Sequence, residues 1–357
     1  VPASTALVPT TSAPTTAPGP PSCAARVTAW PLADRLEQLL MVGAEFSDLP
    51  ASSDAALAGV GGFVLFGEPP ATARPAVGAG LAALRSAASR GGHPPPWLAT
   101  DEEGGTVDRL ADVIGALPSA RRMAAQWSPE QVQLAAAEHG AAMRALGVDM
   151  DLAPVIDTAP SGDLVADEAD RSFADDPGVV GAYGSAFAAG LRAGGVTPVV
   201  KHFPGLGHAT GNTDLGPATG PALAALEASD LRPFQQVIAG GAPVVMVAHV
   251  AVPGLTGGVP ASLAPATYAF LRGTLGFEGV ALTDSLGAGA VSAAGYTEAA
   301  AAVTALEAGA DMAMIDAASW WAVMAALEHA VATGALPASA VDRSAARVLR
   351  VKGACAP

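Results

Sequence analysis

Short apolar runs recur along the chain, and a longer segment with helical spacing follows each of them. Eight such runs lie at residues 39–46, 60–67, 96–101, 148–157, 196–203, 243–250, 279–285 and 311–316. Continuous apolar runs are typical of strands that are buried on both faces, as in a parallel sheet. The Ala-rich segments between them, among them residues 129–146, 296–310 and 338–352, predict helices.

Eight strands that alternate with helices predict an α/β fold, a closed (β/α)8 barrel of the TIM type, formed by residues 26–357 as a single domain. A doubly wound open sheet is the alternative. No glycine-rich phosphate-binding turn follows the first strand, which makes that alternative weaker. The length of 357 residues suits a barrel of this kind.

Ionisable residues stand at the ends of the predicted strands. They are Asp101, Asp157, Lys201, His202, His249, Asp284 and Asp316. In a (β/α)8 barrel the reactive side chains gather at the C-terminal ends of the strands. So many charged groups would be costly in a core, and the pattern therefore predicts a functional site at this end of the barrel.

Composition and charge narrow the class of protein. Hydrophobic residues make up 51% of the chain and charged residues only 14%, which allows a large buried core. The net charge of -15 argues against a nucleic-acid partner, because no basic stretch could neutralise phosphates. No uninterrupted apolar run reaches about 18 residues, so we expect no transmembrane segment. We expect a monomer.

The first 25 residues differ from the rest, since they are mainly Pro, Thr, Ala and Ser. This composition predicts a flexible tether. The sequence does not begin with Met, which is consistent with the removal of a signal segment. We therefore expect a secreted or cell-envelope-associated, extracytoplasmic protein.

Two cysteines, Cys23 and Cys355, lie at the two edges of the predicted domain. The chain ends meet in a barrel, so a disulfide between them is geometrically plausible in an exported protein. Two unpaired thiols are the alternative.

Several motifs occur in a fixed order from about Leu32 onward. They are "LADRLEQLLMVG", "GGFVLFG", "ATDEEGGTVDRL", "GVDMDLAPVIDT", "ADRSFADDP", "KHFPGLG" and "PASLAPATYAFLRGTLGFEGVALTDSL". This series resembles glycoside hydrolase family 3, and in particular its single-domain β-N-acetylhexosaminidases. "KHFPGLG" is the most specific match. The resemblance implies hydrolysis of terminal β-linked N-acetylglucosamine in cell-wall-type glycans, with retention of configuration and without a cofactor.

The resemblance also implies roles for individual residues. Asp284, in "TDSL", would be the nucleophile. The residues that would hold the hydroxyl groups of the sugar are Asp101, Arg171, Lys201 and His202, and His249 would line the same pocket. The chemistry agrees, because a retaining glycosidase needs a carboxylate beside the anomeric carbon and a separate proton donor. A carboxylate among cations should stay ionised.

Some of these residues have structural alternatives. Asp284 could cap the helix that follows it, and His249 could be a satisfied core histidine. Arg171 could form a salt bridge with Asp175 or Asp176.

Other residues near the motifs are expected to be structural. One of Glu102 and Glu103 is expected to support the loop backbone. Asp157 and Asp316 could either support the site or be purely structural. We expect His93, His139 and His329 to be surface or helix residues. The histidines lack ligand spacing, so we predict no metal site.

The acid/base is the point at which the sequence departs from the family. Many relatives carry a second domain that supplies it. This sequence ends after its eighth predicted helix, so we expect the acid/base to come from the barrel. In the hexosaminidase subgroup, a mobile loop after the fifth strand ends in Asp-Ser-His or Asp-Thr-His. Asn212, Thr213 and Asp214 stand at these positions.

Three explanations follow. Asp214 could be the acid/base, with its pKa raised by Asp284 and by the exclusion of water. His208, in the same loop, could take the role. The site could also bind sugars without turning them over. We favour Asp214, and a retaining β-N-acetylhexosaminidase, over another retaining β-glycosidase or a catalytically impaired glycan-binding protein.

Overall fold

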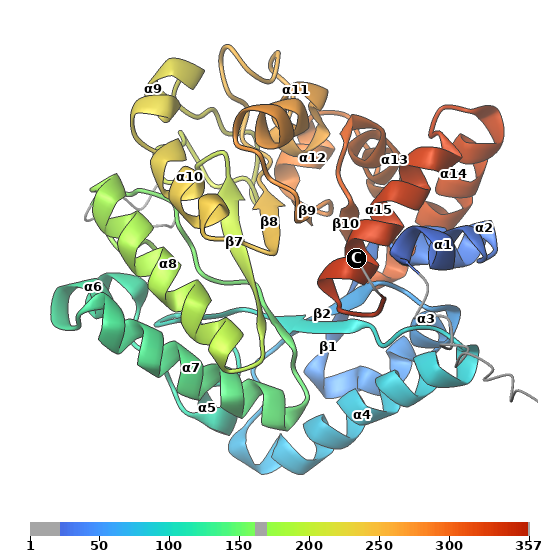
Figure 1. Ribbon diagram of the computed structural model, residues 1–357, viewed down its shortest axis with the longest axis horizontal. Helices are drawn as coiled ribbons and strands as arrows, with labels where there is room; N and C mark the ends of the chain where they lie inside the picture. The colour runs from blue at the N-terminus through green and yellow to red at the C-terminus, as the bar shows by residue number, and fades with distance from the viewer. Residues whose placement is uncertain (1–21, 161–169, 356–357) are drawn as a thin grey trace, which may run out of the picture.

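The computed structural model describes residues 22–160 and 170–355, and it confirms the predicted (β/α)8 barrel (Figure 1). Eight parallel strands close in the order β1-β10-β9-β8-β7-β6-β3-β2. They are β1 (Leu40–Glu45), β2 (Gly62–Phe66), β3 (Trp97–Thr100), β6 (Met150–Asp151), β7 (Thr197–Phe203), β8 (Val244–Val247), β9 (Val280–Ser285) and β10 (Met312–Ile315). Each of the eight predicted apolar runs contains one of these strands.

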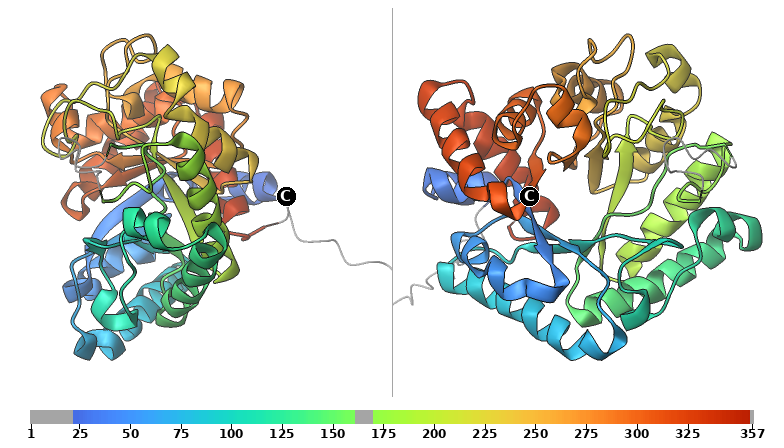
Figure 2. Two further views of the ribbon diagram at one scale, coloured as in Figure 1. Left: turned by 90° about the vertical axis from the view of Figure 1, so that its left-hand side faces the viewer. Right: turned by 180° about the vertical axis from the view of Figure 1, so that it is seen from behind.

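Helices form an outer ring around the strands, as Figures 1 and 2 show. The longer ones are α4 (Arg74–Gly91), α7 (Pro129–Leu146), α8 (Pro177–Ala193), α10 (Leu231–Ala239), α13 (Glu298–Ala308), α14 (Trp320–Thr333) and α15 (Ala338–Val351). The shorter ones are α1 (Cys23–Thr28), α2 (Leu32–Glu37), α3 (Ser53–Ala58), α5 (Ala111–Ile114), α6 (Ala120–Gln126), α9 (Leu223–Ala228), α11 (Pro265–Ala269) and α12 (Gly289–Ala293). Helix α7 has the predicted bounds, because Ser128 and Gln131 form a capping box and Gly147 ends the helix.

The strand predicted at residues 148–157 is much shorter than expected. Only Met150–Asp151 pairs regularly with both neighbours. Pro154 has no backbone N–H to donate, so the ladder breaks after this point. The segment still follows β7, because the Ile156 amide donates to the Lys201 carbonyl at 2.7 Å.

The inside of the barrel is a packed apolar layer. Its buried members are Met41, Val64, Trp97, Ala99, Met150, Leu152, Val199, Val244, Met246, Val280, Leu282, Met312, Met314 and Val348. Trp97 begins β3 and therefore lies toward the N-terminal end of the barrel. A second, larger apolar layer lies between the strands and the helices. The interior is filled in this way, so the barrel is a packed core and not a pore.

A small antiparallel hairpin, β4 (Glu102–Gly104) with β5 (Val107–Asp108), follows β3 at this end. Gly104 and Gly105 turn the hairpin with φ of 87° and 70°, a region that favours glycine. A Cβ on Gly104 would lie 2.3 Å from the Pro118 carbonyl oxygen. The "EEGG" motif therefore fixes the two glutamates in place beside the end of β3.

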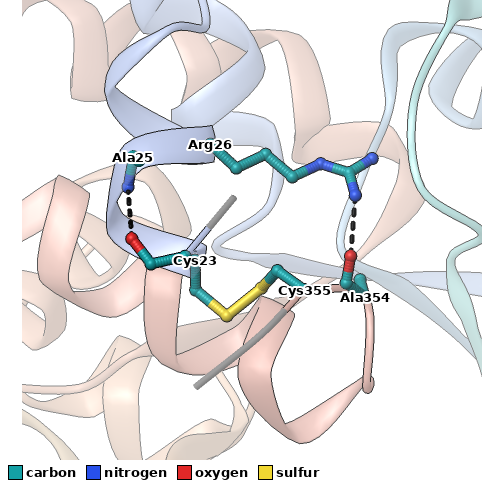
Figure 3. Close-up of a disulfide and its surroundings, with 6 residues drawn as sticks. Cys23, Ala25, Arg26, Ala354 and Cys355 are labelled. Atoms are coloured by element: carbon teal, nitrogen blue, oxygen red, sulfur yellow. Dashed lines mark hydrogen bonds between the residues drawn. A yellow bond between two sulfur atoms is a disulfide. The ribbon is translucent and has the colours of Figure 1, made fainter. Parts of the chain in front are cut away.

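The two ends of the described chain are joined. Helix α1 packs beside α15, and a disulfide links Cys23 to Cys355, the predicted pair, with Cα atoms 5.1 Å apart (Figure 3). The Arg26 guanidinium donates to the Ala354 carbonyl at 2.7 Å beside this bond. The tether predicted for residues 1–25 lies mostly outside the described residues. Helix α1 begins at Cys23, within the last residues of the predicted tether.

Within the two described ranges, no helix has both the length and the apolar character that a membrane span requires.

Candidate active site

A polar pocket of about 290 Å³ opens at the C-terminal ends of the strands. Six of the predicted site residues line it: Asp101, Arg171, Lys201, His202, Asp214 and Asp284. Apolar side chains, including Phe66, Leu152 and Met246, form the rest of its wall. The barrel thus brings together residues that lie up to 183 positions apart in the chain, between Asp101 and Asp284.

A chain of alternating charges runs along one side of the pocket. Lys201 Nζ lies 2.7 Å from both Asp101 Oδ1 and Glu103 Oε1. The Arg171 guanidinium holds the same Glu103 carboxylate in two hydrogen bonds, of 2.7 and 2.9 Å. Burial would raise the pKa of Glu103, but Arg171 and Lys201 outweigh it and hold that pKa well below its usual range. Glu103 is therefore an anion that holds two cations in place at the pocket wall.

Glu103 contributes more to the pocket than its motif predicts. It was grouped with Glu102 as a candidate support for the loop backbone, and Glu102 alone has that role, because its Oε1 accepts the Leu110 amide at 2.7 Å. In an extended segment, side chains that are two residues apart, such as those of Asp101 and Glu103, point to the same side. This rule could have distinguished Glu103 from Glu102. Arg171 pairs with Glu103, a partner that the sequence analysis did not consider.

His202 is held by Asp157, whose carboxylate is completely buried. His202 Nδ1 lies 2.7 Å from Asp157 Oδ2, and the amides of His202 and Leu206 also donate to this carboxylate. The contact fixes Nδ1 as the donor to the carboxylate and holds the orientation of the ring at the pocket wall. Asp157, at the end of its predicted strand, therefore positions a pocket residue and is not merely structural.

Asp284 lies near the end of β9 and lines the pocket. Burial alone would raise the pKa of its carboxyl, but the His249 and His202 imidazoles, the Ser285 amide and Lys201 outweigh burial and hold that pKa below its usual value. Asp284 Oδ1 accepts the Ser285 amide at 2.8 Å. The carboxylate is therefore ionised and held in one orientation, as a nucleophile requires.

His249 lies beside the pocket and is not among the residues that line it. Its Nε2 is 2.7 Å from the Ser285 carbonyl oxygen and its Nδ1 is 2.7 Å from Ser262 Oγ. The carbonyl can only accept, so Nε2 carries a proton, and Nδ1 shares a hydrogen bond with the Ser262 hydroxyl. In place of the expected direct contact with the sugar, His249 supports the end of β9 next to Asp284.

The loop that follows β7 brings Asp214 to the pocket. Asn212 Oδ1 accepts the Asp214 amide at 2.8 Å. The carbonyls of Thr213 and Asp214 accept the amides of Ala290 and Gly289, at the start of α12, at 3.0 and 2.9 Å. The Asp214 backbone is therefore fixed from both sides, with its side chain in the pocket.

Asp214 and Asp284 line the same pocket, and the pKa values of their carboxyls are shifted in opposite directions. Burial raises the pKa of Asp214, and the negative charge of Asp284 raises it further. The pKa of Asp284 is lowered. Two carboxyls with pKa values displaced in opposite directions are the arrangement from which an acid and a nucleophile can be assigned.

His208, the other candidate acid/base, points elsewhere. Its Nδ1 lies 2.8 Å from Asp230 and its Nε2 3.2 Å from Asp175. Burial lowers its pKa, but these two carboxylates outweigh burial and raise it. His208 is not among the pocket-lining residues, so its geometry does not favour a role in proton transfer to the sugar.

A second cluster of ligand-type side chains lies behind the pocket. Ligand atoms of Glu102, Asp108 and His139 gather within 4.8 Å of one another, and all three residues are buried. His139 is thus a helix residue, as expected, although it does not lie at the surface. Burial, with Asp108 and Asp151 nearby, raises the pKa of Glu102 to about 11, and burial lowers that of His139. Two of the three groups are therefore neutral, which fits a structural tie between the hairpin and α7.

This fold and this pocket are those of a (β/α)8-barrel glycoside hydrolase. The model of the protein family "Glycosyl hydrolase family 3 N terminal domain" matches residues 31–351 of the chain. The chain therefore belongs to glycosyl hydrolase family 3, as the motifs predicted.

Known proteins of similar sequence and structure carry related names. The "Beta-hexosaminidase LpqI" of Mycobacterium tuberculosis is 41% identical over 280 residues, which are 76% of this chain and 71% of that protein. The solved structure of M. tuberculosis LpqI superposes with a TM-score of 0.85 and 38% identity, and covers 95% of this chain and 98% of the other. A β-N-acetylhexosaminidase from Beutenbergia cavernae superposes with a TM-score of 0.80 and 32% identity, and covers 91% and 99%.

Proposed function

We propose that the protein is a retaining β-N-acetylhexosaminidase in which Asp284 is the nucleophile and Asp214 the acid/base. The observation that carries this proposal is the presence in one pocket of two carboxyls whose pKa values are shifted in opposite directions. The names of the relatives supply the sugar, since the relatives include proteins called β-hexosaminidase and β-N-acetylhexosaminidase.

The reaction has two steps. In the first, the Asp284 carboxylate attacks the anomeric carbon while Asp214 gives its proton to the leaving glycosidic oxygen, and the C–O bond breaks. In the second, Asp214 takes a proton from water, the water oxygen attacks the anomeric carbon, and the bond to Asp284 breaks. Two inversions give net retention, and both carboxyls return to their starting protonation states.

The remaining pocket residues bind the sugar. Asp101 and Lys201 present an acceptor and a donor to vicinal hydroxyl groups, and Arg171 adds positive charge to the same wall of the pocket. Phe66 and Met246 offer apolar surface for the faces of the ring. The neighbouring carboxylates Asp101 and Asp284 oppose a phosphate in the same place.

We infer that the substrate is an N-acetylglucosamine-containing glycan of the cell-wall type and that the protein acts outside the cytoplasm. The disulfide between Cys23 and Cys355 supports this location, since such bonds persist in oxidising compartments. The protein is expected to act as a monomer.

One assay tests the proposal. The protein is incubated with an aryl β-N-acetylglucosaminide and with an aryl β-glucoside at pH values from about 4 to 8, beside the Asp284→Ala variant. We expect the wild type to turn over the first substrate and the variant to lose this turnover. Mass spectra of the wild type should show a trapped glycosyl group on Asp284. Turnover of the glucoside alone would indicate a different glycosidase. Sugar binding without turnover of either substrate would indicate a glycan-binding protein.

A further inference from the structure

His208 lies near the start of the loop that carries Asp214, and both of its ring nitrogens face carboxylates. Nδ1 lies 2.8 Å from Asp230 Oδ1, and Nε2 lies 3.2 Å from Asp175 Oδ1. A carboxylate only accepts hydrogen bonds, so each nitrogen must carry a proton to bond its partner. The geometry therefore makes His208 a cation. We call these two contacts the His208 bridge.

The His208 bridge joins three segments of the chain at one side of the site. His208 follows β7, and Asp230 immediately precedes α10 and is only 2% exposed. Asp175 precedes α8, in the segment that also carries Arg171, and its side chain is 58% exposed. The bridge therefore has a buried end at Asp230 and an exposed end at Asp175.

Two carboxylates set the charge of His208. Asp230 and Asp175 raise its pKa, and burial opposes them. The remaining polar neighbour is neutral, since the Thr158 hydroxyl lies 3.4 Å from Nδ1 and donates to Asp230 at 2.9 Å. The imidazolium is therefore present at acidic pH, and it is lost as pH rises through the raised pKa.

The backbone of the loop packs against the same two residues that surround His208. A Cβ on Gly205, whose φ is 128°, would lie 2.7 Å from the Asp230 Cβ. A Cβ on Gly207 would lie 2.0 Å from the Thr158 carbonyl oxygen. The loop thus approaches this wall closely, and the His208 side chain binds it at the point of contact.

The loop closes on itself directly after His208. The Thr210 amide donates to the Thr219 carbonyl at 3.0 Å, and the Thr219 amide donates to Thr210 Oγ1 at 2.9 Å. Residues 211–218, which include Asp214, therefore form an excursion that is closed two residues after His208. The excursion is attached to α12 at its tip, so the His208 bridge holds its base.

We propose that His208 is a positioning residue for proton transfer, and that its bridge between Asp230 and Asp175 sets where the Asp214 carboxyl meets the glycosidic oxygen. The inference rests on the proposed function, in which Asp214 is the acid/base. A neutral imidazole has one N–H, so loss of the proton leaves one carboxylate facing a lone pair. The exposed Asp175 is the partner that can turn to water. The bridge is thus complete at the acidic pH at which Asp214 holds its proton.

Hydrogen exchange tests the bridge without any substrate. Exchange of the amides in residues 211–218, corrected for intrinsic rates, is measured by mass spectrometry across pH, and NMR follows the His208 imidazole. In the wild type, protection should fall as pH rises through the His208 titration. In His208→Gln, protection should be about tenfold lower at acidic pH and show no such step, because one hydrogen bond to a charged group is lost. Equal protection in both proteins at all pH values rejects the bridge.

Asp175→Asn tests the exposed end of the bridge and removes only one charge at the surface. It should lower the pKa of His208 in the NMR titration and lower protection of residues 211–218 about threefold, since a partly exposed ion pair contributes little. Asp175→Glu should restore both. His329→Gln, at an exposed position of α14, is the matched control and should change neither. An unchanged His208 titration in Asp175→Asn would contradict the bridge.

Aryl β-N-acetylglucosaminides with leaving groups of different acidity test the effect on proton transfer. His208→Gln should lower kcat/KM about tenfold for poor leaving groups and less than about twofold for activated ones, because only the former need the Asp214 proton. His329→Gln should match the wild type throughout. A merely structural role predicts an equal loss across the series, and that result rejects positioning.

The two kinds of measurement separate the hypotheses. Absence of aryl turnover by the wild type contradicts the proposed function and, with it, a role of His208 in proton transfer. Wild-type turnover together with unchanged exchange and an equal loss across the series contradicts only the positioning role of His208.

Discussion

The side-chain oxygen of Asn212 accepts a hydrogen bond from the backbone amide of Asp214 at 2.8 Å. In the hexosaminidase subgroup, the resemblance leads us to expect an aspartate in place of Asn212, where it would orient a histidine. Here the residue acts on the backbone of the loop. With Gly289 bound to the Asp214 carbonyl, it holds a carboxyl in the pocket where an imidazole was expected.

Replacing Asp214 with Asn should show whether this carboxyl transfers the proton. We expect kcat/KM to fall by about 10²–10⁴ for substrates with poor leaving groups, because these need a proton in the transition state. Activated aryl substrates should lose much less. Rates measured over a series of leaving groups of different acidity check this. An equal loss across the series would show that Asp214 acts in binding and not in proton transfer.

Asp112→Asn, at an exposed position of α5, is the matched control for that series and should change nothing. Asn212→Ala should lower kcat about fivefold, since one hydrogen bond of about 1 kcal/mol to the loop is lost.

The pH profile should follow the opposite shifts of the two carboxyls. Catalysis needs Asp284 ionised, which holds above its lowered pKa, and Asp214 protonated, which holds below its raised pKa. Activity should therefore peak at acidic pH and fall as pH rises through the pKa of Asp214. Asp214→His should move the basic limb toward about 6.5, the reference value of imidazole. If the basic limb of the pH profile does not move in this variant, that limb reports the titration of a group other than residue 214.

Glu103→Gln should destabilise the barrel and weaken sugar binding together. The substitution leaves Lys201 and Arg171 without their shared anion, and removing one member of a buried ionic network costs about 3–5 kcal/mol. Denaturant titration measures the loss. Glu68→Gln removes the exposed partner of Arg109 and should cost under about 1 kcal/mol.

The same glutamate should make stability depend on pH. The pKa of Glu103 is lower in the folded than in the unfolded chain. Its stabilising contribution is therefore complete above the unfolded value of about 4.3 and is lost as pH falls toward the folded value. The wild type should lose more stability on acidification than Glu103→Gln does. Parallel stability curves for the two proteins would contradict this.

Replacing both Cys23 and Cys355 with Ser should lower the free energy of unfolding by about 6 kcal/mol in the chain-entropy relation, because the bond closes a loop with a sequence separation of 332 residues. Thermal unfolding of the variant measures this, and the wild type in reducing agent should match it. The aryl substrate assay should give an unchanged KM, since the bond lies away from the pocket-lining residues. An unchanged melting temperature would show that the bond does not constrain the unfolded chain.

The barrel could be predicted from the sequence because each strand lies in a continuous apolar run, and most of these runs have an ionisable residue near the end. Asp101, Lys201, His202 and Asp284 could be assigned to one pocket for the same reason. The shortness of β6 could not be predicted, since it depends on how the chain around Pro154 pairs with β7.

Partners within the site were harder to predict, because they depend on side-chain direction across the barrel. The sequence predicted His249 on a strand next to Asp284. It did not predict that the ring nitrogens of His249 form hydrogen bonds with the Ser262 hydroxyl and the Ser285 carbonyl. Likewise, no motif in the sequence distinguishes Trp320 and Trp321. Their contribution to a cavity arises because β10 is followed directly by the start of α14 beside β1.

The bond between Cys23 and Cys355 has a mechanical consequence. A barrel held only by hydrogen bonds between its first and last elements can be peeled open by traction on its two ends. Here traction applied outside these cysteines passes through one covalent link and bypasses the 331 residues between them. The catalytic end of the barrel is thereby shielded from pulling forces that act on either end of the chain.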